Sequence, residues 1–177
     1  MKVIQVLGYS GSGKTTAITS LSKSLTKKGF KVGTLKHIYD HKFTIDQKAK
    51  DTHRYALSGS KTVVAVSPGE LAIIQKRNTG SMKPREILRI FEETGTDYLL
   101  IEGFNKMFAR SKRINRIICA STEKEALELL SLHPGPICIS GRIASTSSRN
   151  RKMSGIPLIS LPKDAPKVLA LLDITKS

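Results

Sequence analysis

The stretch "GYSGSGKTT" (residues 8–16) constrains the fold of this chain more than any other feature. It follows the short apolar run "KVIQVL" and precedes a segment in which Ile18, Leu21 and Leu25 recur at helical spacing. Glycines let a backbone curl so that successive N–H groups converge on one anion, beside the positive end of the helix that follows. The sequence therefore predicts a strand, a phosphate-binding turn and a helix.

The spacing of this stretch matches the P-loop pattern G-x-x-x-x-G-K-[ST], in the strand-to-helix context that the pattern requires. We expect Lys14 to contact the β and γ phosphates of a nucleotide, Thr15 to bind Mg²⁺ and Thr16 to contact the α phosphate. The dinucleotide fingerprint G-x-G-x-x-G does not fit, because Thr16 stands where its third glycine belongs. The predicted phosphate site consists of Gly8, Ser10, Gly11, Ser12, Gly13, Lys14, Thr15 and Thr16.

The rest of the chain alternates apolar, strand-like runs with helical patterns, which favours parallel strands joined by right-handed helical crossovers. We predict one α/β domain over residues 1–177 with the three-layer P-loop NTPase fold. Its sheet is expected to be mostly parallel, with about seven or eight strands and helices on both faces. Strands are expected at residues 2–7, 31–38, 61–67, 71–77, 97–104, 113–121, 136–141 and 157–161.

Two connecting segments carry predictions of their own. Pro68-Gly69 separates two strand-like runs and favours a hairpin turn between them. The segment between Gly141 and Gly155, "RIASTSSRNRKMS", is rich in serine and arginine, which is typical of a surface loop.

A P-loop that uses Mg²⁺ needs a carboxylate at the end of a neighbouring strand. The run "YLLIEG" places Glu102 after four apolar residues and before a glycine. We predict that Glu102 holds the metal or one of its waters, and a helix cap or a surface salt bridge is the alternative. Asp46, on the loop after the second strand, is a further candidate for the metal.

The charge balance favours anionic partners. Thirty Lys and Arg residues against fourteen Asp and Glu give a formal charge of +16. Nucleic acid is a weak candidate, because the four tyrosines and five phenylalanines form no stacking platform and tryptophan is absent. No apolar stretch approaches the roughly 18 residues that cross a bilayer, and no cleavage site follows the N-terminus, so we expect a cytoplasmic protein.

Three segments, "GYSGSGKTT", "LKHIYDHKFTIDQKAKDTHRYALSGS" and "LLIEGFNK", together resemble the molybdopterin-guanine dinucleotide biosynthesis protein B (MobB) family. The resemblance covers the first two-thirds of the chain and weakens after about Arg116. The second segment is more specific than the P-loop. The resemblance implies a protein that binds GTP with Mg²⁺, usually as a homodimer, hydrolyses GTP weakly, and assists the guanylyltransferase that joins GMP to molybdopterin.

The resemblance also implies functional positions. For the metal, the candidates are Thr15, Glu102 and Asp46. For a second anion or a nucleotide switch, they are Lys36, His37, His41, Asp46, Lys50 and Asp51. The histidines at 37 and 41 are alternatively a zinc pair or ordinary hydrogen-bonding residues.

The chain departs from the family pattern in ways that leave the base open. Ala49 replaces a usual glycine, Ser140-Gly141-Arg142 replace a usual acidic residue, and the guanine-reading motif Asn-Lys-x-Asp is absent from the sequence. A small-molecule kinase using ATP is the alternative function, because a phosphate loop, a metal-binding acid and a basic acceptor pocket are also the parts of a kinase, and "ASTSSRNRK" could be its lid. The basic strip at residues 106–116 is a candidate for the pterin phosphate or an acidic partner, or is a solvated loop.

Overall fold

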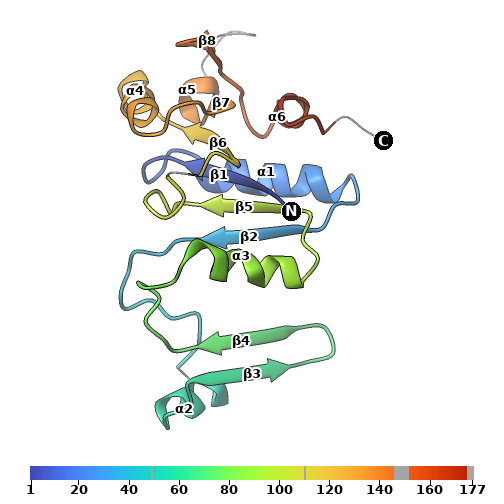
Figure 1. The fold of residues 1–177 in the computed structure, drawn as a ribbon, viewed down its shortest axis with the longest axis vertical. Helices are drawn as coiled ribbons and strands as arrows, with labels where there is room; N and C mark the ends of the chain where they lie inside the picture. The colour runs from blue at the N-terminus through green and yellow to red at the C-terminus, as the bar shows by residue number, and fades with distance from the viewer. Residues whose placement is uncertain (49, 110, 146–151, 175–177) are drawn as a thin grey trace. The chain divides into compact units, whose positions relative to one another are not determined.

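The computed structural model describes residues 1–48, 50–109, 111–145 and 152–174 of the chain (Figure 1). These residues divide into two compact units. The first comprises Met1–His37 with Pro84–Ser177, and the second comprises Ile38–Lys83. The single folding domain predicted over residues 1–177 stays a prediction.

A sheet of five strands forms the centre of the first unit, in the order β2-β5-β1-β6-β7. The strands are β1 (Lys2–Leu7), β2 (Val32–Lys36), β5 (Tyr98–Glu102), β6 (Ile114–Cys119) and β7 (Cys138–Ser140). All four neighbouring pairs are parallel. Because the strands run the same way, the residues that follow each of them gather at one edge of the sheet, where doubly wound folds bind ligands.

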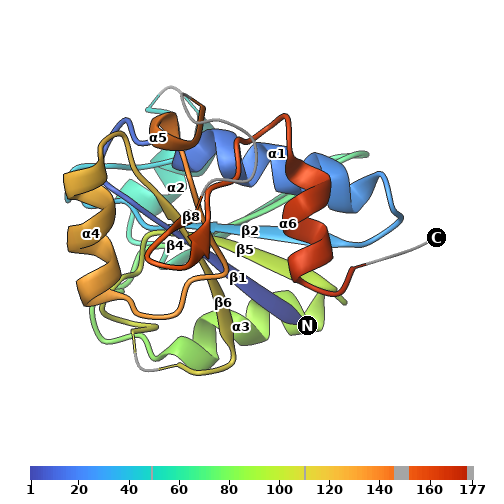
Figure 2. The same ribbon diagram turned by 90° about the horizontal axis from the view of Figure 1, so that it is seen from above.

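Two helices, α1 (Lys14–Thr26) and α6 (Ala165–Leu171), cover one face of this sheet (Figure 2). Their apolar residues form a single core with alternate residues of the strands. In α1 the buried stripe contains Ile18, Leu21 and Leu25, as the helical spacing predicts. The fit between helix and sheet is what holds the start of α1 at the end of β1.

Two further helices, α3 (Pro84–Glu93) and α4 (Glu123–Leu132), cover the opposite face (Figure 2). Leu88 and Phe91 of α3 pack against a cluster that contains Leu99 of β5. Helices therefore cover both faces, and the predicted three-layer α/β fold is confirmed. Among the described residues, no helix is long and apolar enough to span a membrane.

The sheet is smaller than expected, and the prediction of seven or eight strands in it is wrong. Two of the predicted strands, β3 (Thr62–Val66) and β4 (Leu71–Gln75), pair with each other in a separate antiparallel sheet. The physical reason is the turn at Pro68-Gly69, which brings consecutive strands directly together. A third small sheet pairs β8 (Lys152–Met153) with β9 (Ile156–Pro157).

The second unit consists of the β3–β4 hairpin and the short helix α2 (Asp51–Leu57). The predicted hairpin is confirmed, and the Ser67 amide donates to the Glu70 carbonyl at 2.8 Å across its turn. Along β3 the buried residues alternate with exposed ones, so one face of the hairpin is turned towards α2 and the other towards solvent.

The segment between Gly141 and Gly155 differs from the predicted surface loop at both of its ends. Helix α5 (Arg142–Ser145) follows Gly141 directly, and β8 precedes Gly155. Residues 146–151, the centre of the predicted loop and of the kinase lid, lie outside the described residues.

Candidate functional site

The P-loop lies between β1 and α1 at the carboxyl edge of the main sheet. Its shape requires glycine at two positions. A Cβ on Gly8 would collide with the Cys119 carbonyl oxygen and Ser12 Oγ. Gly13, which precedes α1, has a φ of 97°, which a residue with a side chain adopts only at a cost. The glycines of the motif are thus explained by the backbone path alone.

The amino group of Lys14 lies over the loop. Its Nζ donates a hydrogen bond of 2.7 Å to the Tyr9 carbonyl oxygen, which also accepts from the Ser12 amide at 3.3 Å. Ser12 is 1% exposed, so it shapes the loop from beneath, whereas Ser10 and Gly11 are exposed. The ammonium group is therefore placed beside the exposed backbone of the turn, where a phosphate would lie.

Thr15 and Glu102, both predicted to serve the metal, lie close together at this edge. Thr15 is the second residue of α1 and Glu102 is the last residue of β5, and Thr15 Oγ1 lies 3.5 Å from Glu102 Oε2. The other carboxylate oxygen, Oε1, lies 3.5 Å from Lys36 Nζ at the end of β2. These contacts follow from the register, which aligns Glu102 with Val6 on one side and with Lys36 on the other.

The hydroxyl of Thr15 and the carboxylate of Glu102 fit a Mg²⁺ ion. Mg²⁺ prefers oxygen ligands, and it is usually held by one or two protein oxygens, waters and the phosphates of a nucleotide. The Glu102 side chain is 14% exposed, so its charge is shielded from bulk water and its attraction for a cation is stronger than at an open surface.

His37 continues the chain from Lys36. Its amide donates to the Glu102 carbonyl at 3.0 Å, and its ring lies 4.6 Å from the ring of Phe104. These contacts hold His37 beside the residues that follow Glu102. Within the described part of the chain, no group of three or more His, Cys, Asp and Glu side chains is placed to hold a metal ion. The zinc pair of His37 and His41 stays an untested alternative.

Asp46 belongs to the second unit, and its side chain is 2% exposed. Its Oδ1 accepts a hydrogen bond of 2.8 Å from Thr52 Oγ1, and its Oδ2 lies 3.7 Å from His53 Nδ1. In this unit the carboxylate therefore anchors the first turn of α2. Its role as a metal ligand stays a prediction. Thr52 and His53 were not among the residues predicted from the sequence.

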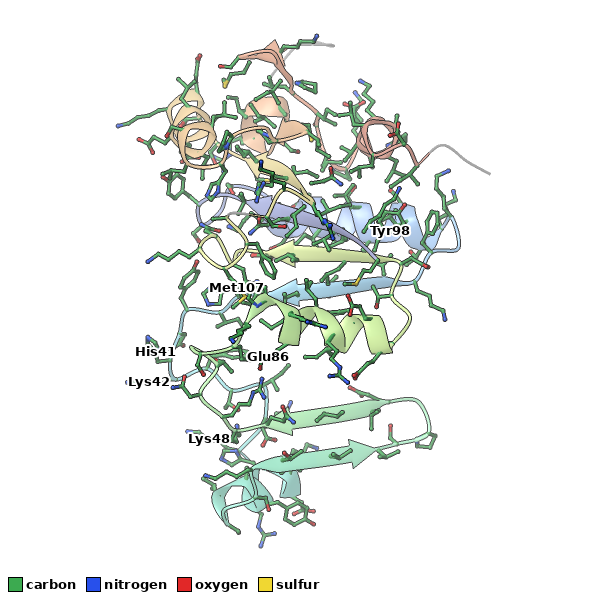
Figure 3. All side chains as sticks on the ribbon, in the orientation of Figure 1. His41, Lys42, Lys48, Glu86, Tyr98 and Met107 are labelled. Carbon is green, nitrogen blue, oxygen red and sulfur yellow. The ribbon has the colours of Figure 1, made fainter. Side chains whose placement is uncertain are left out.

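The remaining candidates of the second segment are exposed side chains of the second unit. Lys50 is the N-cap of α2, and its carbonyl accepts from the amides of His53 and Arg54. Asp51 accepts from Arg54 at 3.3 Å. His41, labelled in Figure 3, is exposed. Binding of a second anion by these residues stays a prediction.

The described basic residues of the strip at 106–116 are of two kinds, exposed side chains and one half-buried side chain that is hydrogen-bonded to the protein. Lys106, Lys112 and Arg113 are exposed, and Arg110 lies outside the described residues. Arg116 is half-buried, and its Nη2 donates to backbone carbonyls at 2.8, 2.9 and 3.1 Å. Its guanidinium group is therefore engaged with the protein rather than presented along a crevice.

Two cysteines lie in the strands beside the P-loop. Cys119 and Cys138 are buried free thiols, as their apolar runs predict. Burial raises the pKa of each to about 12, so both are protonated at neutral pH. They act as small apolar groups of the core rather than as nucleophiles.

Two residues of the site region escaped prediction. Tyr9 of the P-loop donates through its hydroxyl to Glu128 Oε2 of α4 at 3.2 Å, and this hydrogen bond raises the pKa of Tyr9. Gln5 is fully buried in the middle of β1, and its amide donates to the carbonyl of Gly103, which follows Glu102. The signal for Gln5 was a polar residue inside the apolar run "KVIQVL".

Comparison with known proteins shows where the chain belongs. A family model described as molybdopterin guanine dinucleotide synthesis protein B matches residues 3–132. The Bacillus subtilis protein named "Probable molybdopterin-guanine dinucleotide biosynthesis adapter protein" is 34% identical over 131 residues, which are 72% of this chain and 69% of that protein. The Haemophilus influenzae protein named "Molybdopterin-guanine dinucleotide biosynthesis adapter protein" is 33% identical over 107 residues, which are 59% of this chain and 57% of that protein.

This chain spans little more than half of some relatives, since its matches cover 57% of the Haemophilus protein and 54% of one from Methanocaldococcus jannaschii. Solved structures agree over the full length. A crystal structure of Bacillus subtilis MobB has a TM-score of 0.73 at 24% identity, covering 97% of this chain and 98% of that chain. A second structure of that protein has a TM-score of 0.71 at 25% identity, covering 100% and 99%. The chain therefore belongs to the molybdopterin guanine dinucleotide synthesis protein B (MobB) family.

Proposed function

We propose that this protein binds GTP with Mg²⁺ and acts in the cytoplasm as an adapter in molybdenum cofactor maturation. In this role it assists the guanylyltransferase that joins GMP to molybdopterin. Family membership and the adapter names of its relatives support the pathway. The observation that carries nucleotide binding is the meeting of Lys14, Thr15 and Glu102 at one edge of the sheet.

Each part of this edge has a distinct task. The backbone N–H groups of the P-loop and the N-terminal end of α1 attract phosphate oxygens. Lys14 adds a charge-assisted hydrogen bond. Bound Mg²⁺ would neutralise charge on the β and γ phosphates, with Thr15 and Glu102 holding it or its waters. These groups favour binding over turnover, in line with the weak GTP hydrolysis that we expect.

We also propose that the protein is a homodimer and that the hairpin of the second unit forms the contact. The exposed face of this hairpin carries two cross-strand pairs, Val64 with Ile73 and Val66 with Leu71. These side chains are 53–78% exposed, which is unusual for four adjacent aliphatic residues. A two-stranded sheet is marginal by itself, and its two open edges invite pairing. A second copy would supply the same apolar face in a two-fold arrangement.

Sedimentation of Val66→Lys and of the double variant Val64→Lys/Ile73→Glu tests the dimer. We expect a dimer for the unaltered chain and monomers for the variants at the same concentration. Leu132→Lys, which alters an exposed leucine at the end of α4, is the matched control and should stay dimeric. Dimeric hairpin variants would contradict this contact.

Calorimetric titration with GTP and with ATP, each with MgCl₂, tests the nucleotide. We expect tighter binding of GTP, and stimulation of molybdopterin guanylation when the protein is added to the guanylyltransferase. Tight binding of ATP together with rapid phosphoryl transfer to a metabolite would instead support the kinase. If neither nucleotide binds, the proposal is wrong.

A further inference from the structure

Two polar side chains lie next to each other in the centre of the main sheet. Gln5 of β1 is 0% exposed, and the parallel register places it directly opposite Arg116 of β6. Residues paired in this way point to the same face of a sheet. Here that face is the one covered by α3, where the surrounding core is otherwise apolar.

Both side chains donate to the chain segment that leaves Glu102. Gln5 Nε2 donates to the carbonyl oxygens of Gly103 at 2.7 Å and Phe104 at 3.3 Å. Arg116 Nη2 lies within 3.1 Å of three further carbonyl oxygens, those of Phe108, Ala109 and Ser111. We name residues 103–109 with Ser111 the post-Glu102 loop; Met107, labelled in Figure 3, belongs to it.

This loop is held in a conformation that needs support. Phe104 has a φ of 56°, and left-handed backbone costs a residue with a side chain about 1–2 kcal/mol. The ring of Phe104 packs against His37, and Phe108, 2% exposed, is part of the core beneath α3. The hydrogen bonds from Gln5 fall on the strained residue and on the one before it, so they offset this cost where it arises.

Removing the polar groups of Gln5 and Arg116 from water costs free energy unless they form hydrogen bonds within the protein. Transfer of an amide from water to an apolar solvent that offers no hydrogen bond costs several kcal/mol of free energy, and transfer of a charged guanidinium group costs more. Apolar residues at both positions would serve the sheet equally well. The loop carbonyls are what these side chains satisfy, and the first of those carbonyls belongs to the residue next to Glu102.

We infer that Gln5 and Arg116 are positioning residues for the Mg²⁺ site. They hold the post-Glu102 loop, and through it they hold the carboxylate of Glu102 in the place where it meets Thr15. This inference rests on the proposed binding of nucleotide with Mg²⁺. Residues that orient metal ligands in this way typically affect metal affinity about 10–100-fold.

The test compares GTP affinity in excess EDTA with GTP affinity in saturating MgCl₂, and takes their ratio as the Mg²⁺ enhancement. Gln5→Met and Arg116→Met keep the length of each stem and remove its donors. We expect each variant to lower the enhancement about tenfold or more, while GTP affinity in EDTA, which reports on the P-loop, stays unchanged. Val168→Ala, which opens the core under α6 on the other face, is the control and should keep the full enhancement.

Three results overturn the inference: folded Met variants with the full enhancement, GTP affinity in EDTA that falls as much as that in MgCl₂, or an equal loss of enhancement in Val168→Ala. Failure of the unaltered protein to bind GTP under either condition would instead overturn the proposed function.

Amide hydrogen exchange of the unaltered protein gives a second test that needs no variant. In the structure the amides of Phe108 and Ser111 are hydrogen-bonded within the loop, at 3.3 and 3.1 Å. We expect both to be protected before nucleotide or Mg²⁺ is added, because the loop is already held in place. Exchange at the rate of an unfolded peptide would overturn the inference.

Discussion

Lys36 and Glu102 face each other across two neighbouring parallel strands, with Nζ 3.5 Å from Oε1. The carboxylate that is proposed to hold Mg²⁺ therefore has a protein cation beside it. Because the Lys36 side chain is 57% exposed, this pair is weak by comparison with a buried one. The ammonium group and the metal compete for the same negative charge.

Substitution of Lys36 by methionine should therefore raise the affinity of the GTP-bound protein for Mg²⁺. We expect a gain of roughly 1.4- to 5-fold, which corresponds to the ~0.2–1 kcal/mol typical of an exposed pair. Titration of Mg²⁺ into the protein with GTP present measures the change. In a Glu102→Gln background the same substitution should have no effect, and a loss of Mg²⁺ affinity in Lys36→Met would show that the lysine assists the metal instead.

Substitution of Gly8 by alanine should destabilise the fold. The added Cβ would collide with the Cys119 carbonyl oxygen, which is backbone of a buried strand and cannot move aside. Overpacking of this kind costs about 1–3 kcal/mol in the free energy of unfolding, which urea denaturation measures. The exposed neighbour Ser10 provides the control, because its replacement by alanine should change stability by less than about 0.5 kcal/mol. Equal stability of the two variants would contradict the close contact.

Acid should weaken the fold through His133. This residue is 8% exposed at the end of α4, and burial lowers its pKa below the ordinary value of 6.5, with a smaller effect from the positive charge of Arg116. Below about pH 6.5 the unfolded chain therefore binds more protons than the folded one. The stability that depends on a neutral His133 is therefore present above that pH and is lost as the pH falls and the buried ring must be protonated.

Replacement of His133 by glutamine should reduce the loss of unfolding free energy between about pH 7 and pH 5. Denaturation at several pH values measures it. Identical profiles for the unaltered protein and His133→Gln would show that this histidine is not responsible.

The sequence predicted the P-loop with its flanking strand and helix, and the place of Glu102 at the end of a neighbouring strand, because these follow from local patterns. Glycine spacing specifies the turn, and an acid at the end of a buried parallel strand must lie at the same edge as the loop. The number of strands was overestimated, since an apolar run such as that of β3 reads the same whether its partner is the main sheet or its own hairpin.

Gln5 was not predicted as a site residue, and Arg116 was predicted as part of the basic strip rather than as a partner of the post-Glu102 loop. The hydrogen bonds of Gln5 join residues 98 and 99 positions apart, and such a pairing depends on the strand order. A polar residue in an apolar strand signals that a partner exists, but it does not say which segment supplies it. Asp46 is a similar case. Its place in a loop suggested a metal ligand, but the hydrogen bond that it accepts from Thr52 depends on how the second unit folds and could not be predicted from local sequence.

The most direct test of the account is the affinity for GTP in MgCl₂ of Lys14→Ala beside that of Lys23→Ala. Both substitutions remove one positive charge from α1, but Lys14 lies at the P-loop and Lys23 is exposed in the last turn. A hydrogen bond to a charged group contributes about 1.5–3 kcal/mol, so Lys14→Ala should lose at least about tenfold in affinity. Lys23→Ala should bind as the unaltered protein does. Equal binding by all three proteins would contradict the assignment of this turn as the nucleotide site.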